Sequence, residues 1–97
     1  MNKRKLNADD IKQAINPADF YRHELNAPLK NHGWSDGGLC PFHSDNKHGS
    51  FFVNLETGAY KCFACVANGG DIISFTMALH GLRFAEVLAQ LAQDWGI

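Results

Sequence analysis

The 97-residue sequence has no surplus of basic residues, no cysteine-rich framework and no long apolar run. Nine lysines and arginines stand against ten aspartates and glutamates, which gives a formal net charge of −1. A dedicated nucleic-acid-binding protein usually carries a basic surplus, so any nucleic-acid contact here should be weak or confined to one face. We interpret the one basic cluster, Lys3-Arg4-Lys5, as a solvated terminus.

These scarcities also argue against secretion and membrane insertion. No apolar run follows the basic N-terminus as in a signal peptide, and no stretch approaches the roughly 18 apolar residues of a transmembrane helix. Three cysteines, an odd number, argue against a closed disulfide framework. We therefore expect a cytoplasmic protein without a membrane partner, in a reducing compartment where thiolate ligands survive.

What the sequence does contain is two pairs of metal-ligating residues, Cys40-Pro-Phe-His43 and Cys62-Phe-Ala-Cys65. Two residues between the ligands let one tight turn direct both side chains at one ion. Together the pairs predict one structural zinc ion held by three thiolates and one imidazole. Four protein ligands leave no open position, so we expect no chemistry at the metal. A redox dithiol would fit the second pair alone but not the first.

Local signals predict helices toward both ends of the chain and strands between them. Helices are predicted over residues 8–15, 17–25, 72–80 and about 83–95. The segment 29–39 is expected to be extended, strands over 50–55 and 59–62 to form a hairpin, and residues 68–70 to form a turn. Helix-capping residues support these limits: Asn7, Asn16, Asp71 and Gly81.

The predicted fold class is α+β, a zinc ribbon on a small antiparallel sheet packed by flanking helices. We expect a single domain, 1–97, with an N-terminal arm and short helix (1–15), the zinc ribbon (29–66) and C-terminal helices (71–95). A chain this short buries only about 60–65% of its unfolded surface, so a structural metal would add needed stability. Apolar residues of the last helix recur at helical spacing, which predicts a buried face: Phe84, Val87, Leu88, Leu91, Ala92 and Trp95.

Four segments extend the motif beyond its ligands, at residues 39–43, 50–53, 60–65 and 70–75. Together they resemble the zinc-binding domain of bacterial DnaG-type DNA primases, over about residues 16–97. The resemblance implies a zinc ribbon with Cys40, His43, Cys62 and Cys65 as the zinc ligands. It also implies that the domain engages single-stranded template DNA and supports primer initiation by a separate catalytic core.

The sequence departs from that family in several ways. The chain stops after the zinc module, so we expect the TOPRIM polymerase core and the helicase-binding tail to be absent and the chain alone to make no primers. Ala64 and Val66 stand where the family commonly has glycines, and we expect Val66 to resist a positive φ. The loop between His43 and Ser50 is one residue longer than usual. The ribbon is also less basic, which predicts lower DNA affinity.

A contact with single-stranded DNA combines cations that follow phosphates with aromatic rings that stack on bases. Side chains alternate across a strand, so one of Phe51 and Phe52 should face outward. Tyr60 is expected to be exposed because its hydroxyl needs a partner, whereas Phe42 and Phe63 are expected to shield the zinc. The candidate DNA-contacting residues are Lys30, Trp34, Lys47, His48, Phe52, Tyr60 and Lys61.

The sequence therefore predicts a stand-alone primase-type zinc module that binds single-stranded template DNA and supports RNA primer synthesis in DNA replication. Its expected partners are a separate primase catalytic core, a replicative helicase, or both. The alternative is a protein–protein docking module of a replication or mobile-element complex that does not bind DNA, which the near-neutral charge favours. A regulatory zinc ribbon acting on RNA or transcription ranks last.

Overall fold

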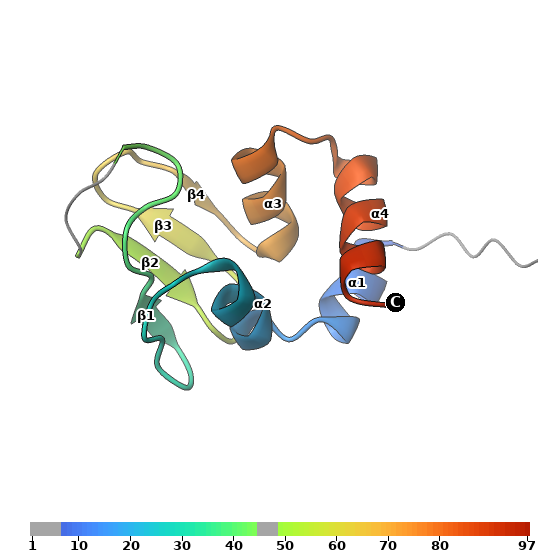
Figure 1. Ribbon diagram of the computed structural model, residues 1–97, viewed down its shortest axis with the longest axis horizontal. Helices are drawn as coiled ribbons and strands as arrows, with labels where there is room; N and C mark the ends of the chain where they lie inside the picture. The colour runs from blue at the N-terminus through green and yellow to red at the C-terminus, as the bar shows by residue number, and fades with distance from the viewer. Residues whose placement is uncertain (1–6, 45–48) are drawn as a thin grey trace, which may run out of the picture.

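The computed structural model describes residues 7–44 and 49–97. Within them the helices are α1 (Ala8–Ala14), α2 (Pro17–Glu24), α3 (Ile72–His80) and α4 (Phe84–Asp94). The strands are β1 (Trp34–Asp36), β2 (Phe51–Asn54), β3 (Tyr60–Cys62) and β4 (Asn68–Gly69), and they form one antiparallel sheet in the order β1-β2-β3-β4. The sheet occupies one end of the molecule, α1 and α4 lie side by side at the other, and α2 and α3 lie between (Figure 1). The predicted α+β class is confirmed.

The helices begin and end where the capping residues predict. Asn7 forms a reciprocal capping box with Asp10, and the Asn16 side chain accepts a hydrogen bond from the Ala18 amide at 2.8 Å. Asp71 caps α3 through the Ser74 amide. Gly81 ends α3 in the left-handed conformation with φ of 64°, which glycine adopts without a steric penalty.

The segment predicted as a turn at residues 68–70 is in part a strand. Asn68 and Gly69 form β4, which pairs with β3 through Lys61 and Tyr60. Neither asparagine nor glycine favours a strand, so packing decides the outcome. A Cβ at Gly69 would collide with the Ser74 hydroxyl and the Tyr60 ring, so this edge can approach α3 only with glycine.

The core is an aromatic cluster between the inner face of the sheet and the helices. Phe75 of α3 is its centre, because its ring centroid lies 5.1–5.8 Å from four other aromatic rings: Phe20, Tyr21, Phe42 and Tyr60. The buried Tyr21 hydroxyl donates a 2.6 Å hydrogen bond to the Gly58 carbonyl, which ties α2 to the β2–β3 hairpin. Burial raises the pKa of Tyr21 well above its usual range, so this hydroxyl stays a donor.

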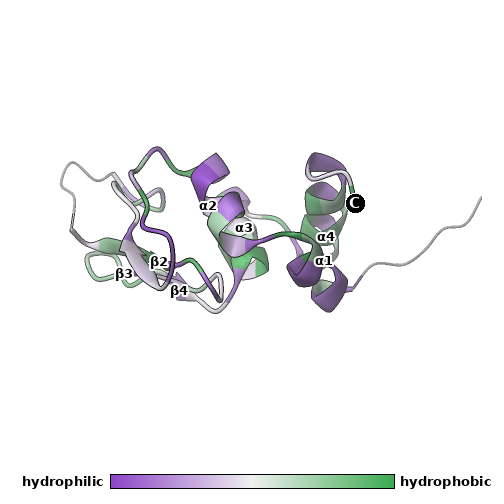
Figure 2. Cartoon of the chain, turned by 90° about the horizontal axis from the view of Figure 1, so that it is seen from below, coloured by the Kyte–Doolittle hydropathy of each residue, from purple (hydrophilic) through white to green (hydrophobic). Residues whose placement is uncertain are grey.

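The predicted buried face of α4 is confirmed along most of the helix. Val87 and Leu91 are buried, and Trp95 packs on Phe20, but Phe84 is 48% exposed, so the prediction is wrong at that residue. Phe84 is the first residue of α4. Figure 2 shows both hydrophilic and hydrophobic turns on α4, as expected of a helix with one buried face. No single helix of the described residues is long and apolar enough to cross a membrane, and α3 and α4, which reach that length and composition together, meet at a 106° bend.

Candidate metal centre and sheet-face groove

Four potential metal ligands meet at one end of the sheet. Cys40 and His43 lie in the segment that follows β1, Cys62 ends β3, and Cys65 lies in the turn after it. Their ligand atoms all lie within 4.8 Å of one another. The sulfur atoms of Cys40 and Cys65 are 3.7 Å apart, and a zinc–sulfur bond of about 2.3 Å separates two sulfurs of a tetrahedron by roughly 3.8 Å. The donor set and the spacing therefore fit one zinc ion.

Backbone amides face the sulfur atoms of the cluster. Burial raises the pKa of Cys40 to about 12, and the Phe42 N–H, 3.4 Å from its sulfur, acts in the opposite direction. Burial also acts to raise the pKa of Cys62, but hydrogen bonds from the amides of Cys65 and Ala64, together with those from the thiols of Cys65 and Cys40, lower the pKa below its usual value. Amide donors stabilise the thiolate, which is the form that binds zinc.

The second metal turn holds a strained residue. Val66 has φ of 57° and is the one non-glycine residue with positive φ in the described ranges. The Cys62 amide donates to the Ala67 carbonyl at 2.8 Å, so residues 63–66 must close a short loop and the chain turns back through the left-handed region. A β-branched residue in that region costs roughly 1–2 kcal/mol. The turn thus imposes on Val66 the conformation that this residue was expected to resist.

The phenylalanines inside the two metal turns have different roles. Phe42 lies against the core, with its ring centroid 5.4 Å from Tyr60 and Phe75. Phe63 is 66% exposed, so the expectation that it shields the zinc is wrong. It directly follows Cys62, whose thiol points inward, and alternation therefore turns its ring to the outer face.

The outer face of the sheet carries an apolar groove of about 300 Å³, lined by Trp34, Phe52, Lys61 and Phe63. These four residues are called the sheet-face groove below. In the sheet register Phe52 lies opposite Lys61. The Phe63 ring centroid lies 5.9 Å from that of Phe52 and 4.8 Å from the Lys61 ammonium. Phe51 is fully buried on the inner face, so the predicted alternation of Phe51 and Phe52 is confirmed.

Tyr60 does not belong to this groove, and the expectation that it is exposed is wrong. It is 3% exposed, and its ring stacks on Phe42 in the core. Its hydroxyl finds a partner inside the protein, the Ser74 carbonyl at 3.4 Å. Tyr60 and Cys62 are two residues apart on β3, so both face inward. The inward direction of Tyr60 could therefore have been predicted from its two-residue spacing from Cys62.

The other candidate residues are distributed more widely. Trp34, Phe52 and Lys61 meet in the groove, whereas Lys30 is exposed in the segment before β1 and does not line it. Lys47, His48 and the Lys3-Arg4-Lys5 cluster lie outside the described residues. Phe63 was missed as a groove residue, although its position two residues after Lys61 could have indicated it.

This chain is similar to known DNA primases. Residues 3–97 match the family described as the CHC2 zinc finger of DnaG. The DNA primases of Rickettsia prowazekii and Streptomyces coelicolor are each 38% identical to the chain, over 90% and 96% of its length, and the chain spans 14% of each of them. The crystal structure of the Aquifex aeolicus primase, comprising its zinc-binding and RNA polymerase domains, matches 91% of this chain and 21% of its own with a TM-score of 0.70 and 30% identity. With the ligand cluster, the family match confirms the prediction of one structural zinc ion.

Proposed function

This chain belongs to the CHC2 zinc-finger family of DnaG-type primases, and from that membership we propose that it binds single-stranded template DNA and supports RNA primer synthesis. In this proposal polymerisation is carried out by a primase catalytic core, and a replicative helicase is a further partner. Among the described residues, the one group of three or more histidine, cysteine, aspartate or glutamate side chains that could hold a metal ion is the zinc cluster.

The sheet-face groove is the observation that supports DNA binding best. Trp34 and Phe63 are 50% and 66% exposed and lie beside Phe52. The three rings together provide stacking surfaces for bases. Stacking on an aromatic side chain contributes about 1–3 kcal/mol per base and tolerates every base. Lys61 lies over the Phe63 ring and brings an ammonium group to the rim of the groove, where a phosphate would pass.

Zinc binding is expected to hold two residues of the groove, Lys61 and Phe63, in place. Phe63 lies between Cys62 and Cys65, so metal binding to both thiolates fixes the turn that presents its ring. Lys61 directly precedes Cys62 on β3. DNA binding in this proposal therefore depends on zinc, although no base or phosphate contacts the metal.

A titration of a fluorescent single-stranded oligonucleotide, followed by anisotropy, tests the proposal. The zinc-loaded chain is expected to bind with an affinity that falls with salt, and removal of zinc should abolish the signal. Lys61→Ala should lower the slope of log K against log salt by roughly 0.7, the value for one phosphate contact with a single strand. Combining Trp34→Ala with Phe63→Ala should weaken binding at least about tenfold, the loss of one stacked base.

Phe84→Ala is the matched control, because Phe84 is a similarly exposed aromatic residue on α4 outside the groove. This variant should bind DNA as the parent does. Equal loss in Phe84→Ala and the groove variants, or no salt-sensitive binding by the zinc-loaded chain, would reject the proposal. The second outcome would favour the docking module, which the net charge of −1 supports.

A further inference from the structure

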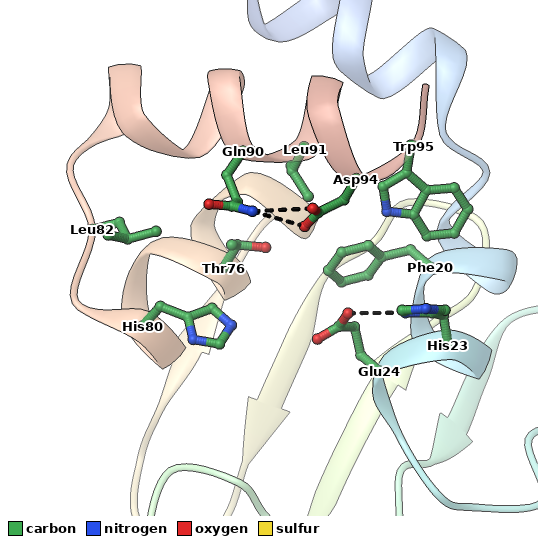
Figure 3. Close-up of a pocket in the computed structure, with 10 residues that line it drawn as sticks. All are labelled: Phe20, His23, Glu24, Thr76, His80, Leu82, Gln90, Leu91, Asp94 and Trp95. Carbon is green, nitrogen blue, oxygen red and sulfur yellow. Dashed lines mark hydrogen bonds and ion pairs between the residues drawn. The ribbon is translucent and has the colours of Figure 1, made fainter. Parts of the chain in front are cut away.

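A second cavity, of about 360 Å³, opens between α2, α3 and α4 on the helical side of the molecule (Figure 3). It shares no residue with the zinc cluster or with the sheet-face groove. Phe20 and Leu91 provide apolar surface within it, and Trp95 forms one wall. The proposed DNA contact does not use this cavity, so any ligand that binds in it would be separate from the DNA.

The cavity concentrates negative charge. Glu24 and Asp94 line it from α2 and α4, and no lysine or arginine of the described ranges lines it. The Glu24 side chain is only 27% exposed and contacts Nδ1 of His23 at 3.2 Å. Both oxygens of Asp94 accept hydrogen bonds from Nε2 of Gln90, at 3.0 and 3.1 Å, which orients the carboxylate. The cavity therefore presents two placed carboxylates to whatever enters it.

The helix ends add to this negative potential. The last residues of α2, α3 and α4 are Glu24, His80 and Asp94, and all of them line the cavity. The C-terminus of a helix carries roughly half a negative charge, and an acidic side chain there is unfavourable by about 0.3–1 kcal/mol. Two acidic residues thus occupy positions that disfavour them, and a bound cation would interact favourably with both the carboxylates and the helix ends.

The aromatic wall selects the kind of cation. The Trp95 ring stacks on Phe20 with the ring centroids 6.3 Å apart, and its centroid lies 5.7 Å from that of His23 with the two ring planes inclined at 62°. A planar guanidinium group can stack on an indole and donate hydrogen bonds in the ring plane to two carboxylates, whereas an ammonium group is compact and more strongly hydrated. The combination of Trp95, Glu24 and Asp94 matches a guanidinium group better than it matches an ammonium group.

We propose that this cavity binds a guanidinium group, presented as an arginine side chain by a partner protein. In an arginine within a polypeptide the guanidinium is the only charge, while free arginine also carries an α-ammonium that competes with the guanidinium for Glu24 and Asp94 and an α-carboxylate that these acids repel. Phe20 and Leu91 are 1% and 3% exposed and form the floor of the cavity, while the partly exposed Leu82 and Trp95 offer apolar surface to the methylene stem of the side chain. The site would give the molecule a protein-docking surface distinct from its DNA-binding face.

Fluorescence of Trp95 in the zinc-loaded Trp34→Phe chain provides the test, because the sequence has two tryptophans. The probe is N-acetyl-arginine amide, which carries the side chain between neutral groups, with an expected Kd on the order of 1 mM. N-acetyl-citrulline amide, the neutral isostere, should bind at least tenfold more weakly, and the lysine analogue and free L-arginine severalfold more weakly. Equal binding of the citrulline compound would overturn the proposal, and tighter binding of free L-arginine would overturn the assignment to a partner protein.

Variants of the two carboxylates complete the test. Glu24→Gln combined with Asp94→Asn is expected to reduce affinity for N-acetyl-arginine amide at least tenfold, while Glu56→Gln, an exposed charge outside the cavity, should leave it unchanged. Removing acids from helix C-termini should not destabilise the fold. If the double variant nevertheless fails to fold, the affinities of the two single variants for N-acetyl-arginine amide provide the test. Parent-like affinity in the folded variants would contradict the proposal.

Discussion

The two faces of the sheet carry the same kinds of residue and use them differently. On the inner face Phe51 and Tyr60 are 0% and 3% exposed and pack on the helices. On the outer face Trp34 and Phe63 are 50% and 66% exposed and line an open groove. Because side chains alternate along a strand, neighbouring aromatic residues separate stability from recognition. Aromatic content alone could not reveal which residue has which role.

The zinc cluster is the point where the two faces depend on each other. The thiol of Cys62 is fully buried on the inner face, while Lys61 and Phe63 on either side of it face outward. Fixing Cys62 therefore fixes the positions of two groove residues. We therefore expect substitutions on the inner face, or loss of the metal, to affect folding. Substitutions on the outer face should affect binding alone.

Removal of zinc is expected to have the largest effect. Chelation, or Cys62→Ser, should unfold the sheet, because apparent zinc binding in small domains contributes about 10–16 kcal/mol that is also folding free energy. Thermal melting and near-UV circular dichroism measure the change. The outer-face variant Lys61→Ala, one residue away, should melt as the parent does. A metal-free chain with an unchanged spectrum and melting temperature would show that the core does not need the metal.

Truncation of one aromatic residue on each face is expected to have the next largest effect. Phe51→Ala leaves a cavity under the sheet and should lower the free energy of unfolding by about 3–5 kcal/mol. Phe63→Ala removes an exposed ring and should cost less than about 1 kcal/mol. Urea denaturation of the zinc-loaded variants measures both values. Losses of similar size would mean that the outer face also supports the fold.

Local chemistry made much of the fold predictable. The caps at Asn7, Asn16 and Asp71 act on amides within three residues, so the helix limits follow from the sequence. The zinc cluster could also be predicted from the sequence, because each of its two turns is local. Only the meeting of the two turns depends on the hairpin.

The features that sequence reasoning missed depend on tertiary packing. Strand β4 exists because α3 packs closely at Gly69, a contact that no local propensity contains. The outward direction of Phe63 follows only when the inward direction of Cys62 is used as a reference for alternation. The cavity near Trp95 requires α2 and α4, which are remote in sequence, to end beside one another.

Val66→Gly is expected to have the smallest effect, and it is the one substitution among these that should stabilise the fold. Glycine adopts the φ of 57° without the roughly 1–2 kcal/mol strain of a β-branched residue. Val66 is 79% exposed, so little apolar contact is lost, but the added freedom of the unfolded chain offsets about 0.4–1 kcal/mol. The net gain should lie between about 0 and 1.6 kcal/mol in urea denaturation at saturating zinc.

Ala64→Gly is the matched control for this last substitution, because Ala64 lies in the same exposed turn and does not have a positive φ. Glycine there relieves no strain and should destabilise the chain by about 0.4–1 kcal/mol. Opposite signs at positions two residues apart would locate the strain in the backbone of Val66. Destabilisation by both would instead mean that the Val66 side chain, although exposed, stabilises the second zinc turn.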